Sequence, residues 1–249
     1  MIRSANPALR GKIFDITTTD DKTMTINGTV GKTAMLLAFL VASGYWTWNV
    51  FSNEADPVIG AQKVMPLLIG GLIGGLIFAI ITHFKLTWAP ITAPLYALCE
   101  GLMLGAISAI FNKQYPGIAL QAVVLTLGTL AVLLVAYRSG LIKATENFKL
   151  GVVAATGGIC ILYFISFIVN IFGGTIPFIS GNGPLSIGLS VVIVIVAALN
   201  LVLDFDFIEH AAETNTPKYM EWYGAFALMV TLVWLYLEIL RLLAKLNRR

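Results

Sequence analysis

The chain has 249 residues, of which 58% are hydrophobic and only 12% are charged, and its formal net charge at pH 7 is +3. Soluble domains carry about 25% charged residues. This composition, with a mean hydropathy of +0.86, therefore excludes a water-soluble domain and indicates an integral membrane protein. The small net charge gives no indication of nucleic-acid binding.

The apolar residues occur in seven continuous blocks. Each block is long enough to cross a bilayer as a helix, which takes about 20 residues. Continuous blocks indicate helices, because the strands of a membrane barrel alternate apolar and polar positions. The sequence therefore predicts an all-α membrane protein with seven transmembrane helices. The predicted blocks are residues 29–50, 64–82, 87–111, 117–137, 148–172, 184–204 and 220–243.

Residues 1–27 form a polar N-terminal extension, which precedes the predicted seven-helix domain of residues 28–249. No secretory signal is evident in the extension, so we expect the first helix to remain as an anchor. Lys and Arg are most frequent on the side of the membrane that holds the N-terminus, which predicts a cytoplasmic N-terminus. The basic C-terminal tail then falls on the other side, against the usual bias, and the side of the C-terminus stays open.

Acidic residues inside the apolar blocks are the candidate functional residues, because a carboxylate at the bilayer centre costs at least about 2.5 kcal/mol. Five acids lie within or next to the blocks, namely Glu100, Asp204, Asp206, Glu209 and Glu238. The other eight are expected to be ordinary solvated groups, and these are Asp15, Asp20, Asp21, Glu54, Asp56, Glu146, Glu213 and Glu221.

Asp204 and Asp206 lie about 200° apart on a helix, so they cannot face the same direction. Asn200 lies one turn before Asp204, which gives that face of the helix two polar groups. This spacing predicts a buried, functional Asp204. Asp206 shares a face with Glu209 and His210 instead, and we expect it to face water at the mouth of the helix.

Glu238 lies well inside the last apolar block, with Arg241 three residues later. Two interpretations stay open for this carboxyl group. It forms an intrahelical ion pair with Arg241, worth only a few tenths of a kcal/mol where water reaches the pair, or it faces the interior of the bundle.

Three segments together resemble the Bax inhibitor-1 family. "LNLVLDFDFIEH" and the later "LYLEILRLL" are similar to the paired acidic signatures of that family, and "PLYALCEGLMLGAIS" is similar to its Glu-Gly-x-x-Leu-Gly pattern. By position, the resemblance implies that Asp204 and Glu238 are facing carboxyls that sense protons, and it points to Glu100 in the ion pathway. Arg241 stands where many relatives have a neutral amide, so it is a competing partner for Glu238.

The resemblance implies a seven-helix bundle in which the last helix is central and wrapped by the other six. It also implies a pH-sensitive leak of calcium through the membrane. From their positions on the same helix, we add Asp206 and Asn200 as further candidates for the ion path. Calcium would be the transported ion, held transiently at Asp204 and Glu238, and no cofactor is implied. The implied location is the inner membrane of a bacterium.

Other functional classes stay open. One is a regulator without transport activity that binds a membrane-bound quality-control protease or another membrane partner. A second is a proton-coupled transporter of a small solute, which would use the same acids as a relay. An enzyme is not expected, because only His83 and His210 are available as histidines and Asp204 lacks the Gly-x-Gly-Asp context of an intramembrane aspartyl protease.

Overall fold

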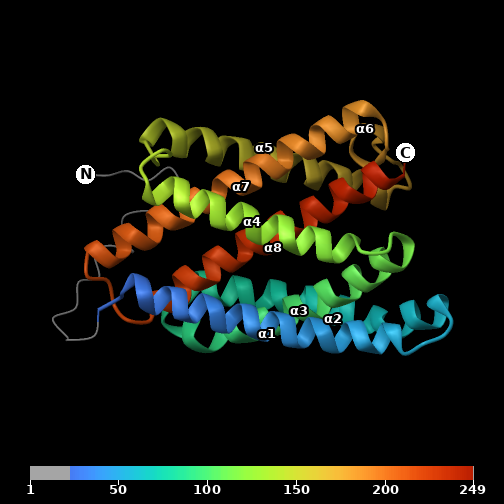
Figure 1. Ribbon diagram of the computed structural model, residues 1–249, viewed down its shortest axis with the longest axis horizontal. Helices are drawn as coiled ribbons and strands as arrows, with labels where there is room; N and C mark the ends of the chain where they lie inside the picture. Colours follow the sequence, from blue (N-terminus) through green and yellow to red (C-terminus); the bar gives the residue numbers. More distant parts are fainter. Residues whose placement is uncertain (1–22, 249) are drawn as a thin grey trace. The chain divides into compact units, whose positions relative to one another are not determined.

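A computed structural model describes residues 23–248, so most of the predicted N-terminal extension, residues 1–22, lies outside the described part. Residues 23–248 form eight α-helices and one short 3₁₀ helix, without a β-strand (Figure 1). The elements are α1 (Ile26–Ser52), α2 (Pro57–Phe84), η2 (Leu86–Trp88), α3 (Ala89–Gln114), α4 (Ile118–Arg138), α5 (Glu146–Ile171), α6 (Pro177–Ser180), α7 (Pro184–Glu213) and α8 (Met220–Asn247).

Seven of these described helices are long and apolar enough to cross a membrane, and α6, with four residues, is not among them. This result confirms the predicted all-α membrane fold. Burial is concentrated in two of the seven, since 61% of the most apolar window of α8 and 56% of that of α3 are buried, against 11–33% in the others. The wrapping of α8 by the other six helices stays a prediction.

The helix starts are set by polar caps that lie ahead of the apolar blocks. α1 begins after Thr25, whose hydroxyl accepts a hydrogen bond from the Gly28 amide at 3.0 Å. α2 begins at Pro57, seven residues before the predicted block, because the Asp56 carboxylate accepts from the Val58 amide at 2.8 Å. Proline at the first position of a helix leaves no amide unpaired. Hydropathy therefore located the apolar part of α2 but not its first two turns.

α7 continues to Glu213, nine residues beyond the predicted end of its block. A 30-residue helix is about 45 Å long, which exceeds the roughly 30 Å thickness of the hydrocarbon core. α7 is therefore longer than an untilted crossing requires. Asp206 does not lie at the end of the helix as expected, because the helix continues for almost two turns after it. That Asp206 faces water stays a prediction.

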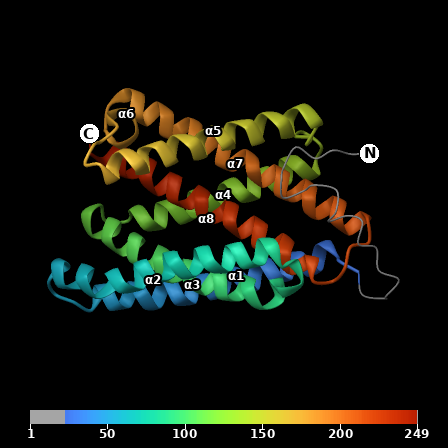
Figure 2. The same ribbon diagram turned by 180° about the vertical axis from the view of Figure 1, so that it is seen from behind.

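The chain divides into two compact units, and α7 and α8 contribute residues to both. The described part of the first unit is residues 120–206 and 231–248, and that of the second is residues 23–119 and 207–230. In the second unit α3 packs against α1 and α2, and the three helices lie side by side in both views (Figure 2). A Cβ atom on Gly105 would overlap the carbonyl oxygen of Gly44, so only glycine permits this approach of α3 to α1.

Glu221, at the start of α8, is fully buried, which corrects the expectation that it is a solvated group. Its Oε1 atom accepts from the Thr25 amide at 3.0 Å and from the Thr25 hydroxyl at 2.9 Å. Lys218 lies 3.2 Å from the same oxygen, and Lys32 pairs with Oε2. The negative charge also lies at the amino end of α1, where the helix dipole favours an anion. We call Glu221, Thr25, Lys32 and Lys218 the amino-terminal clasp.

Candidate functional site: carboxyls within the spanning helices

Asp204 lies on α7, and one of its carboxylate oxygens has no partner. The Oδ2 atom is buried and forms no hydrogen bond in the described part of the chain. The Asp204 side chain does form a hydrogen bond with that of Thr231 on α8. An unpaired carboxylate oxygen is costly away from water. Asp204 is therefore a group that proton binding or cation binding would satisfy.

Asn200 lies one turn before Asp204, as the sequence predicted, but its amide has other partners. Its Nδ2 atom donates to the Thr156 hydroxyl on α5 at 2.9 Å and to the carbonyl oxygen of Val196 at 2.8 Å. Asn200 therefore joins α7 to α5, and its place in an ion pathway stays a prediction.

Glu238 lies on α8 with 1% of its surface exposed, and three side chains donate to it. One nitrogen of Arg241 lies 2.9 Å from both carboxylate oxygens, the Tyr163 hydroxyl lies 2.8 Å from Oε1, and the Trp234 ring nitrogen lies 3.2 Å from Oε1. Both interpretations of Glu238 therefore hold, because the carboxyl is buried in the protein and it also pairs with Arg241.

Tyr163 is a site residue that sequence reasoning missed. Its hydroxyl donates to Glu238 and accepts from Arg241 at 2.6 Å, and the Arg241 guanidinium lies 5.2 Å from the centre of its ring. A tyrosine in the middle of an apolar block needs a partner for its hydroxyl. That requirement was the available signal, although it does not identify the partner.

Asp204 and Glu238 are engaged at different levels of α8. Thr231, the partner of Asp204, precedes Glu238 by seven residues, and seven residues of α-helix span about 10 Å. No hydrogen bond of the described residues joins the two carboxyls, and the donors to Glu238 come from α5 and α8. The facing pair that the resemblance implied is thus not hydrogen-bonded in this structure, and its role as a proton sensor stays a prediction.

Asp206 forms an ion pair with Lys149 of α5, whereas Asp204 is hydrogen-bonded to Thr231 of α8. Its Oδ2 atom lies 2.7 Å from the Lys149 ammonium on α5, and 30% of the Asp206 side chain is exposed. Partly exposed ion pairs contribute about 0–1 kcal/mol. Asp206 therefore provides a matched control for Asp204, with the same chemistry on the same helix and a different environment.

Glu100 is the buried carboxyl of the second unit, where it lies on α3 with 8% of its surface exposed. Its Oε2 atom is buried without a hydrogen-bond partner among the residues described, and its side chain is hydrogen-bonded to that of Tyr96. A Cβ atom on Gly75 of α2 would lie 2.8 Å from the Oε1 atom of Glu100. The glycine of α2 therefore provides the space that the carboxyl occupies.

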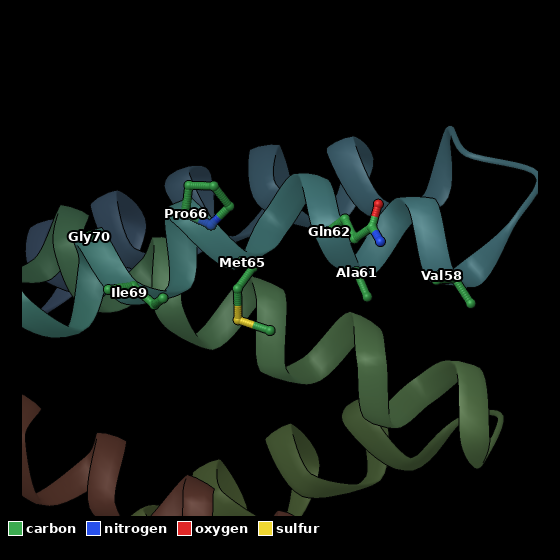
Figure 3. A pocket seen from close by; sticks show the side chains of 7 residues that line it. All are labelled: Val58, Ala61, Gln62, Met65, Pro66, Ile69 and Gly70. Atoms are coloured by element: carbon green, nitrogen blue, oxygen red, sulfur yellow. The ribbon is translucent and has the colours of Figure 1, made fainter.

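No cluster of metal ligands accompanies these carboxyls in residues 23–248. No group of three or more His, Cys, Asp or Glu residues there could hold a metal ion, and transient calcium at Asp204 and Glu238 stays a prediction. A hollow of about 810 Å³ lies along α2 (Figure 3), lined by Val58, Ala61, Gln62, Met65, Pro66, Ile69 and Gly70. None of these side chains ionises, so the hollow is not part of the candidate site.

Seven apolar helices of spanning length, of which α3, α7 and α8 carry a buried carboxyl, define a multi-pass membrane protein with ionisable groups inside its spans. The model of the family described as "Bax inhibitor 1 like" matches residues 6–248, so the chain belongs to that family. This match confirms the resemblance that the acidic segments indicated. No curated protein and no solved structure matched the chain.

Proposed function

We propose that this protein is a pH-sensitive leak pathway for calcium, located in a bacterial inner membrane with a cytoplasmic N-terminus. The observation that carries the proposal is the unpartnered, buried oxygen of Asp204 within a spanning helix. Ionisable groups inside a membrane are expensive and typically mark ion or proton paths. Family membership supports a transport role, because the family is associated with functions of the ion-channel and transport kind.

Calcium suits this arrangement because it is a hard cation that prefers carboxylate and carbonyl oxygens. Asp204 and Glu100 each offer an oxygen that has no protein partner among the described residues. Proton binding removes the negative charge from such a carboxyl and thereby its attraction for a cation. The proposal makes Asp204 the principal proton-binding group and Glu100 a further group along the path.

Glu238 has a different part in the proposal, because Arg241 contacts both of its oxygens. A guanidinium in this position neutralises the carboxylate and occupies the side from which a cation would bind. Calcium therefore reaches Glu238 only after Arg241 has moved away. Arg241 is in this way an internal competitor of the transported ion. In the proposal Asp204 acts beside Thr231 of α8, and Glu238 acts seven residues further along that helix.

The test is calcium flux into proteoliposomes, measured between pH 5.5 and pH 8.5 with the wild type, Asp204→Asn and Asp206→Asn. We expect Asp204→Asn to flatten the pH response by at least about tenfold in the ratio of extreme rates, because one proton-binding step is lost. Asp206→Asn should retain the response. Unchanged flux and pH response in Asp204→Asn would remove that carboxyl from the mechanism.

Two other outcomes would assign the protein to another class. A regulator without transport activity would be supported by two results together. The wild type would show no calcium flux at any pH, and a membrane protease would be captured only when residues 1–22 are present. Uptake of a small solute that collapses with the proton gradient would support a proton-coupled transporter. The proposal includes no enzymatic step.

A further inference from the structure

Lys245, in the last turn of α8, has an ammonium group that lies inside the protein. The residue is 7% exposed. Its Nζ atom donates to the carbonyl oxygen of Ile179, to the Ser186 hydroxyl and to the Ser190 hydroxyl, each at 2.8 Å. The carbonyl oxygen of Ser186 lies further away, at 3.4 Å. We call these four oxygen atoms the oxygen cage.

The cage is assembled from α6 and the first two turns of α7, all within the first unit. Ser186 and Ser190 are four residues apart, so their hydroxyls lie on one face of α7. They are 1% and 2% exposed. The Ser186 hydroxyl also donates to the carbonyl oxygen of Ile179 at 3.2 Å, so a direct hydrogen bond joins α7 to α6 in addition to the bonds from Lys245.

Among the described residues, only neutral oxygens accept hydrogen bonds from this ammonium. An ammonium has three protons to donate, and three oxygens of the cage lie at hydrogen-bond distance from it. None of the ion pairs found in residues 23–248 includes Lys245. The amino end of α7 carries partial positive charge, which opposes a cation here, so the cage oxygens provide the compensation.

Hydroxyl and carbonyl oxygens without a carboxylate are the ligands with which proteins replace the hydration shell of potassium. Calcium sites differ from the cage in composition, because they usually include carboxylates. The four cage oxygens belong to two carbonyl groups and two hydroxyl groups. The cage therefore fits a monovalent cation such as ammonium or potassium better than it fits calcium.

We propose that the oxygen cage is a binding site for one monovalent cation, and that the Lys245 ammonium is its tethered occupant. In the wild type the lysine fills the site and excludes free ions. A chain without this ammonium group binds a free cation in its place. This inference does not depend on calcium transport, because it concerns a different ion at different residues.

The experiment uses purified full-length protein in detergent and the thermal unfolding midpoint of Lys245→Ala. The midpoint is measured in N-methylglucamine chloride and at equal ionic strength in ammonium, potassium, sodium and calcium chloride. In N-methylglucamine we expect a midpoint at least about 4 °C below that of the wild type, because buried acceptors lose their donor. Ammonium and potassium should restore about half of this loss or more. Sodium and calcium should restore less, and the wild type should show no such selectivity.

Two variants serve as controls. Lys245→Met retains an unbranched chain of similar length without the charge, so its midpoint should not depend on which cation is present. Adding Ser190→Ala to Lys245→Ala removes one cage oxygen. The ammonium concentration for half-maximal restoration should then rise about tenfold, since a hydrogen bond to a charged group is worth this much or more.

A Lys245→Ala midpoint that is the same in all five salts would overturn the proposal, as would an equal cation response in Lys245→Met. If Lys245→Ala yields no folded protein in any salt while Lys245→Met folds, the cage does not bind free ions and the proposal is also wrong. Folded Lys245→Ala that requires ammonium or potassium throughout purification would support it.

Discussion

Arg241 donates from a single nitrogen to both carboxylate oxygens of Glu238, at 2.9 Å in each case. The two residues are three positions apart on α8, yet their environments differ. The Glu238 side chain is 2% exposed and that of Arg241 is 42% exposed. A buried carboxylate is thus compensated by a partner that remains in contact with the surroundings of the protein.

This relationship predicts strong coupling between the two residues. Arg241→Met should lower the free energy of unfolding by about 1–3 kcal/mol, because it leaves a buried carboxylate without its cation. Glu238→Gln should be destabilising as well, but the double variant should recover at least about 1 kcal/mol relative to the sum. Unfolding of all four proteins in SDS titrations measures this coupling. Strictly additive losses would show that the ion pair does not contribute.

The amino-terminal clasp predicts that replacing Gly28 by alanine lowers stability, whereas the same change at Gly31, also on α1, does not. A Cβ atom on Gly28 would overlap the Glu221 carboxylate, whereas one on Gly31 would meet nothing within 4 Å. Gly28→Ala should therefore reduce stability by about 1–3 kcal/mol, because the buried carboxylate must move. Gly31→Ala should be neutral or stabilising by up to about 1 kcal/mol, since alanine favours the helix. Thermal unfolding distinguishes them, and equal midpoints would contradict the packing at Glu221.

The close approach of α1 and α3 leads to a third prediction. Gly105→Ala places a Cβ atom against the backbone of Gly44, which cannot yield without a shift of one helix. We expect a loss of about 1–3 kcal/mol and a lower yield of folded protein in detergent. A Cβ atom on Gly128 of α4 would meet nothing within 4 Å, so Gly128→Ala is the control and should retain the wild-type yield.

The fourth prediction concerns Glu100 in the proposed pathway. Gly75→Ala would put a methyl group 2.8 Å from the Glu100 carboxyl, whereas at Gly70 nothing lies within 4 Å. Gly75→Ala should change calcium flux in proteoliposomes by at least about threefold, because the carboxyl is pushed from its place. Gly70→Ala should not. If both variants are folded and conduct at the wild-type rate, Glu100 is not on the path.

Hydropathy and length were sufficient to predict the seven spanning helices, because a membrane requires about 20 apolar residues per crossing. They did not predict the end of α7. Its last turns are rich in charged residues and resemble a loop, but Phe207, Ile208 and Ala211 are buried and hold these turns against the protein. Asp56–Pro57 is a capping signal for the start of α2, and hydropathy does not detect it.

The candidate carboxyls could be predicted, but their partners could not. Charge inside an apolar block singles out Glu100, Asp204 and Glu238 from the sequence alone. Tyr163 lies 75 residues before Glu238 in the chain, and no local pattern connects them. Glu221 was misjudged for the same reason, since its partner Thr25 is 196 residues away. Packing between segments that are distant in the sequence decides which side chains meet. The hydrophobic periodicity of one helix does not predict its partners on another helix.

The separation of 196 residues between Thr25 and Glu221 also bears on how the protein is made. The first helix enters the membrane while most of the chain is still unsynthesised, and its amino end then lacks the carboxylate that accepts from Thr25 and Lys32. That partner arrives only with the last helix. Contacts this distant in sequence form late, because closing so long a loop costs entropy before it yields any contact. The amino-terminal clasp therefore forms only after Glu221 has been synthesised, and a chain that stops before α8 lacks it.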